Sequence, residues 1–99
     1  MRLDKFTIKA QEAIQEAVSL AKGLNHQQAD NEHLLLALLK QEESIIAELL
    51  AGLGLNTAAL TREIESDLKG RSKIYAKLQE VYFSTRMNNL LHNAEKEAG

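Results

Sequence analysis

A stripe of apolar residues at helical spacing runs through the first quarter of the chain. Its members recur every three or four residues, so they share one face of a helix with 3.6 residues per turn. Thr7 stands where an N-cap hydroxyl would accept from the first free amides, and Gly23 where a left-handed residue would end the helix. The pattern predicts a first helix between these two positions. The stripe comprises Phe6, Ala10, Ala13, Ile14, Ala17, Ala21 and Leu24.

The stretch from Glu32 to about Gln41 has a different pattern, because leucine and alanine occupy nearly all of its sides. Only a narrow polar strip remains around His33 and Lys40. A helix that is apolar almost all round is typically packed by neighbours on several faces, so we expect this one at the centre of the fold. Asp30 or Asn31 would cap its start. The apolar run is Leu34, Leu35, Leu36, Leu38 and Leu39.

Two more helices are expected before residue 70. The third runs from Ser44 to Ala51 with its apolar residues on one face, and two glycines then interrupt it. The fourth begins after Asn56 as N-cap, and Gly70 ends it. Leu55 and Leu60 flank that cap at the spacing of a hydrophobic staple. These predictions give a unit of four helices.

Residues 71–80 form a basic-then-mixed connector whose apolar spacing allows partial helix, and a last helix is expected from about Ser84 to Ala98. This helix echoes the first at an offset of 77 residues, with Phe83-Ser84 matching Phe6-Thr7. Nothing further along the chain echoes the leucine-rich second helix. We therefore expect that a second repeat begins and is cut off at residue 99.

The expected fold is all-α. A compact helical bundle would hold one complete four-helix repeat (residues 1–70), a connector (71–80) and the first helix of an incomplete second repeat (81–99). The last helix would then carry apolar surface made for an absent repeat. Exposed apolar surface is unfavourable by about 25 cal/mol per Å². We therefore expect this helix to fold back on the first four helices or to pair with a neighbouring chain.

Composition narrows the function further. A formal net charge of −2 and a pI near 5.9 give no reason to expect a nucleic-acid partner. The absence of cysteine excludes a disulfide framework and a thiolate nucleophile. No apolar stretch is long enough to span a membrane, and the start has no signal-like apolar region, so we expect a cytoplasmic protein without a membrane partner.

The run Glu-His-Leu-Leu-Leu-Ala-Leu-Leu at residues 32–39 resembles the N-terminal repeat of Clp-family ATP-dependent chaperones. The alanine-stepped first helix, His26 and the later apolar steps are similar to the same repeat. The opening Met-Arg-Leu-Asp-Lys-Phe-Thr resembles the start of ClpB-type disaggregases in particular. Residues 81–96 resemble the opening of the family's second repeat. The connector departs from the family pattern, which is usually rich in glycine and proline.

The resemblance implies a domain that recruits misfolded or aggregated polypeptide, or an adaptor protein, to an ATPase hexamer. It implies a binding groove between the repeats, to which Thr7, Tyr82, Leu90 and Leu91 would lie nearest. ATP and Mg²⁺ would belong to the parent protein, because this chain has no phosphate-binding Gly-x-x-x-x-Gly-Lys-Ser/Thr loop. We expect no cofactor, no bound metal and no catalysis in these 99 residues.

Two alternatives stay open. The domain could belong to a protease-associated Clp ATPase and bind adaptors. Residues 47–64 also have the outline of a helix-turn-helix, although Glu63 and Glu65 would oppose DNA on its second helix.

The histidines and the basic connector are given structural interpretations. His26, His33 and His92 lack the i, i+4 pairing of a metal site, so we interpret His33 as a helix-surface residue and the others as isolated. The basic residues of the connector are interpreted as solvated. They are Lys69, Arg71, Lys73 and Lys77.

Overall fold

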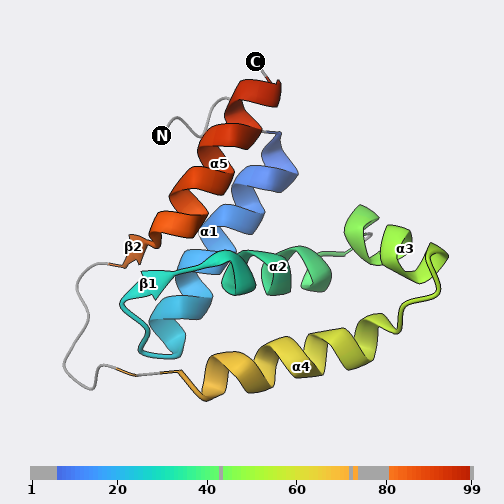
Figure 1. Ribbon diagram of the computed structural model, residues 1–99, viewed down its shortest axis with the longest axis horizontal. Coiled ribbons are helices and arrows are strands. Elements are labelled where there is room, and N and C mark those ends of the chain that lie inside the picture. Colours follow the sequence, from blue (N-terminus) through green and yellow to red (C-terminus); the bar gives the residue numbers. More distant parts are fainter. Residues whose placement is uncertain (1–6, 43, 72, 74–80, 99) are drawn as a thin grey trace.

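The structure is a computed structural model that describes residues 7–42, 44–71, 73 and 81–98. Within these residues, five helices pack together and two short strands lie at one side (Figure 1). The all-α prediction is confirmed, with one addition: β1 and β2 pair in parallel, with Gln28 opposite Tyr82 and Ala29 opposite Phe83. The elements are α1 (Ile8–Gly23), β1 (Gln28–Ala29), α2 (Asn31–Lys40), α3 (Ile45–Gly52), α4 (Thr57–Lys69), β2 (Tyr82–Phe83) and α5 (Thr85–Ala98).

The N-caps predicted at Thr7, Asn56 and Ser84 are confirmed, because each side-chain oxygen accepts from a backbone amide three residues on. Ser44, which was expected to be the first residue of the third helix, caps α3 in the same way. The open choice at α2 falls to Asp30, which forms a reciprocal capping box with His33. Thr7 and Ser84 are equivalent as N-caps, since each hydroxyl accepts a hydrogen bond from the backbone amide three residues further on. The bonds are Thr7 from Ala10 (3.2 Å), Ser44 from Ala47 (3.1 Å), Asn56 from Ala59 (3.1 Å) and Ser84 from Met87 (3.1 Å).

The end of α1 differs from the prediction. Gly23 is still helical, and the left-handed residue is Asn25, with φ of 61°. Asparagine tolerates this conformation better than most side chains. The His26 amide then donates to the Ala21 carbonyl at 2.8 Å, which closes the helix end. The glycine was therefore the wrong marker, and the chain turns two residues later.

α2 is central, as expected, because it contacts α1, α3, α4 and α5. Its two sides face two apolar clusters. The first joins α1, α2 and α5, and the second joins α2 and α4. Buried residues of the first are Ala13, Ile14, Ala17, Ala21, Ala29, Leu34, Ala37, Met87 and Leu91, and those of the second are Leu36, Ile64 and Leu68.

α5 folds back on the first four helices, which confirms one of the two outcomes expected for it. Met87 and Leu91 lie in the same buried cluster as Ile14 and Ala17 of α1. Phe83 packs against that cluster, as its match to Phe6 suggested. Residues on either side of the connector thus share one core. The division into 1–70, 71–80 and 81–99 stays a prediction, and partial helix in the connector falls mostly on residues outside the described ranges.

Candidate functional site

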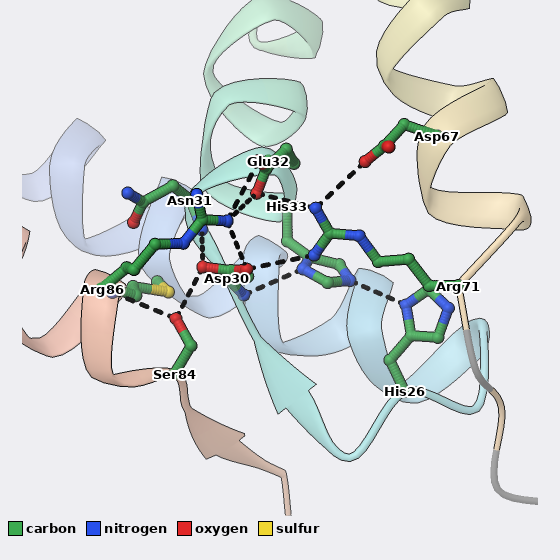
Figure 2. Close-up of polar contacts among 10 residues, drawn as sticks. His26, Asp30, Asn31, Glu32, His33, Asp67, Arg71, Ser84 and Arg86 are labelled. Atoms are coloured by element: carbon green, nitrogen blue, oxygen red, sulfur yellow. Dashed lines mark hydrogen bonds and ion pairs between the residues drawn. The ribbon is translucent and has the colours of Figure 1, made fainter.

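A cluster of charged side chains joins the start of α2 to the end of α4 and the start of α5 (Figure 2). Asp30 lies at its centre. Its Oδ1 accepts from the Ser84 hydroxyl at 2.6 Å and from the Asn31 amide at 2.8 Å. Its Oδ2 accepts from Arg86 at 2.6 Å and from Arg71 at 3.1 Å. Both oxygens of the Asp30 carboxylate therefore accept hydrogen bonds. The two arginines lie 41 and 56 residues further along the chain than Asp30.

Glu32 extends this cluster along the first turn of α2. Its carboxylate lies 2.9 Å from Arg86 and 3.0 Å from Arg71, and Arg71 also pairs with Asp67 of α4 at 3.0 Å. We call this group the Asp30 cluster: Asp30, Glu32, Asp67, Arg71, Ser84 and Arg86. The prediction that the basic connector is solvated is wrong for Arg71, because it is half-buried among three carboxylates.

The cluster fixes the charge states of its members. Burial alone would raise the pKa of Asp30, but hydrogen bonds from Arg86, Ser84, Asn31 and Arg71 outweigh it and hold that pKa well below its ordinary value. The same two arginines and a backbone hydrogen bond lower the pKa of Glu32 against the effect of burial. Both carboxylates are thus ionised and engaged at neutral pH, so neither is available as a general base.

His26 and His33 form a buried pair beside this cluster, which corrects both earlier interpretations. His33 faces the core and not the helix surface, and His26 is not isolated: its Nδ1 lies 2.9 Å from Nε2 of His33. The Asp30 amide donates to Nδ1 of His33 at 2.9 Å. This bond assigns the tautomer, because Nδ1 must accept, so Nε2 carries the proton and donates to His26.

Burial, the neighbouring His26 and the charge of Arg71 lower the pKa of His33 to about 4. Burial, followed by Arg71 and Lys73, also lowers the pKa of His26. Nε2 of His26 is buried and makes no hydrogen bond of good geometry among the described residues, although the Leu68 carbonyl is close enough to favour its protonated form. Both rings are therefore neutral and structural at pH 7. No group of three possible metal ligands occurs among the described residues.

The residues predicted to contact polypeptide are not gathered at one place. Thr7 precedes α1 and Tyr82 lies in β2, and both are exposed. Figure 1 shows α5 running back along α1, so the start of α1 lies by the end of α5, and β2 lies at the opposite end. On α5, Leu90 is 44% exposed, but Leu91 is only 3% exposed. Leu91 is a core residue here, which corrects its assignment as a contact residue.

α3 carries exposed apolar residues whose exposure was not predicted from the sequence pattern. None of its residues is buried, whereas every other described helix contributes buried side chains. Together with the turn that follows it, α3 leaves four large apolar side chains between 52% and 76% exposed. They are Ile45, Leu49, Leu53 and Leu55, and we call them the α3 surface.

A match to the family described as the Clp repeat (R) N-terminal domain covers residues 5–99. The chain belongs to this family. Curated relatives named Chaperone protein ClpB are similar along nearly its whole length. The protein from Bacillus cereus is 35% identical over 99% of this chain, that from Vibrio cholerae 37% over 99%, and ClpB 1 of Synechococcus elongatus 37% over 94%.

The chain spans only about a tenth of the length of these relatives: 12%, 11% and 10%, respectively. The family match also covers α3 and α4, so the two helices that have the outline of a helix-turn-helix lie within the Clp repeat domain. None of the described helices is both long and apolar enough to cross a membrane.

Sequence reasoning missed the Asp30 cluster in this Clp N-terminal domain. Asp30 and Arg86 are 56 residues apart, and Asp30 and Arg71 are 41 apart. A carboxylate at the cap of the central helix was a visible signal. Its arginine partners were not, because no local spacing relates them to it.

Proposed function

We propose that this Clp N-terminal domain recruits polypeptide to an ATP-dependent chaperone by binding exposed apolar segments of misfolded proteins, or an adaptor that carries them. The observation that carries the proposal is its membership of the family, with relatives named as ClpB chaperones, together with exposed large apolar side chains on a folded helical scaffold. Clients of this kind share apolar segments and little sequence, so apolar contacts suit them better than precise hydrogen bonds.

Thr7, Tyr82 and Leu90 remain the proposed contact residues, because all three are exposed. Leu90 lies on the same helix as Met87 and Leu91, which pack into the core, so it is presented by a fixed element. Catalysis is no part of this proposal. ATP and Mg²⁺ would bind elsewhere in a longer parent protein, assembled as a hexamer in the cytoplasm, since these 99 residues contain no phosphate-binding loop.

Fluorescence anisotropy with a labelled, permanently unfolded test protein checks the proposal, with labelled duplex DNA as the competing ligand. We expect the domain to bind the unfolded protein with little dependence on salt between 50 and 200 mM, and the Tyr82→Ser/Leu90→Ser variant to bind it more weakly. DNA binding that weakens steeply with salt, without polypeptide binding, would overturn the proposal.

A further inference from the structure

α3 is the most apolar helix in composition, yet it contributes nothing to either buried cluster. Six of its eight residues are Ile, Leu or Ala. Ile46 and Leu50 are half-buried, on the side where α3 contacts α2 and α4. Ile45 and Leu49 lie one turn apart on the other side and face solvent. Exposed apolar patches larger than roughly a few hundred Å² are rare on soluble proteins and often mark interaction sites.

This face is held in place and is not a frayed end. The Ser44 hydroxyl caps α3 and also donates to the Leu38 carbonyl of α2 at 2.7 Å, which ties the start of α3 to the central helix. At the other end, Gly54 adopts φ of 84° and the Leu55 amide donates to the Leu50 carbonyl at 3.0 Å. Leu53 continues the four-residue spacing of Ile45 and Leu49. Leu53 and Leu55 are both exposed in this closed turn.

The charges around the α3 surface restrict what can bind there. Between Ser44 and Thr61 the sequence has a single charged residue, Glu48, and no lysine or arginine. A nucleic acid or an anionic lipid surface needs basic residues, so neither fits. An uncharged or weakly basic apolar ligand fits both the side chains and the single carboxylate.

The size of the α3 surface distinguishes between two remaining ligands, a second copy of this chain and a short flexible segment. Eight helical residues span about 12 Å. A stable dimer between two copies needs roughly 1,200–2,000 Å² of total buried surface, which is more than one such helix and its turn can supply. A short flexible segment needs less, because it can add a few apolar side chains at a time and bind weakly.

We infer that the α3 surface is a second polypeptide-binding site, which takes short, apolar, uncharged or weakly basic segments of unfolded chains. The inference rests on the proposed function and places part of the binding on a face that the predicted contact residues do not include. A domain that contacts an unfolded chain both at the α3 surface and at the separate residues Tyr82 and Leu90 holds that chain at more than one point. Its overall affinity then exceeds that of either set of contacts alone.

The test uses the full chain and the unfolded protein described above, with three variants. Ile45→Ser/Leu49→Ser changes only exposed side chains, so the fold should persist, which circular dichroism verifies. We expect at least fivefold weaker binding for this variant. Glu48→Gln, on the same helix, is the matched control and should bind within twofold of the wild type, because it keeps the apolar face. Tyr82→Ser/Leu90→Ser reports separately on the contact residues of the proposed function.

Wild-type affinity in the α3 variant, alongside weakened binding in the Tyr82/Leu90 variant, would overturn the inference and leave the proposed function intact. Absence of binding by the wild type would overturn both. A second measurement does not depend on substitutions: amide chemical shifts of residues 45–55 should move on adding an apolar, uncharged peptide. Movement confined to residues 82–91 would also refute the α3 site.

Discussion

α2 and α3 are both rich in aliphatic residues and adjacent in sequence, yet their apolar side chains have opposite environments. In α2 the apolar residues fill two clusters, and Leu36 is 2% exposed. In α3 no residue is buried. The difference follows from position, because α2 contacts four other helices while α3 has neighbours on one side only. A high apolar content therefore indicates that a helix favours contact with another surface. It does not show that the fold covers the helix on every side.

The largest expected effect contrasts a leucine from each helix. Leu36→Ala in α2 removes a buried side chain from a packed cluster and should lower the free energy of unfolding by about 3 kcal/mol. Leu49→Ala in α3 removes an exposed one and should change it by less than about 0.5 kcal/mol. Urea unfolding of the two variants measures both values. Equal losses would show that α3 is buried in solution and would remove the contrast.

The caps of the two helices should differ in the same direction. Asp30→Ala removes the α2 cap and hydrogen bonds to two arginines, so we expect a loss of about 3 kcal/mol. Ser44→Ala removes the α3 cap and should cost about 1 kcal/mol. Thermal unfolding ranks them. In high salt the Asp30 difference should shrink, since part of it is an exposed ion pair with Arg86. A salt-independent difference would assign it to the cap alone.

The last contrast is a pH dependence that comes from a buried histidine of α2. The ordinary pKa of His33 is 6.5 and its folded value is about 4, so between these values only the unfolded chain binds the proton. Stability should therefore fall as pH drops through this range, by about 2 kcal/mol between pH 7 and 4.5. His33→Gln should reduce the slope while preserving the cap, because glutamine can accept from the Asp30 amide.

His26, whose pKa is also lowered by burial, should add to the slope in the same direction, so part of the slope should remain in His33→Gln. An unreduced slope in this variant would show that His33 is not its source. Asp30 and Glu32 stabilise the fold at neutral pH, because their pKa values are lower in the folded chain than in the unfolded chain. This stabilisation is lost only as pH falls below their unfolded-chain pKa values, so they affect the pH dependence at lower pH than His33 does.

The local features were predictable because each depends on residues within one or two turns. Thr7 and Asn56 cap helices by bonds to amides three residues away, and the apolar run of α2 marks a central helix whatever packs on it. One local feature was predicted wrongly: Gly23 was preferred to Asn25 for the left-handed turn, although asparagine also tolerates that conformation.

The candidate site was less accessible to sequence reasoning. Tyr82 and Leu90 were placed on the surface correctly, but Leu91 was not, because the orientation of α5 decides which leucine of an adjacent pair is buried. His33 looked like a polar position on a helix surface until His26 and the Asp30 amide supplied its two partners. The α3 surface was visible only as an apolar stripe, with no sign that it would stay uncovered.

The sequence by itself determined the helices, most of their caps and the family, since periodicity, capping and the run at residues 32–39 are local properties. Only the tertiary structure decided that α5 lies on α1 and α2, that Asp30 collects two arginines 41 and 56 residues away, and that α3 is left facing solvent. The physical reason is that burial and ion pairing depend on which surfaces meet, and apolar attraction is not directional enough to specify that from the pattern alone.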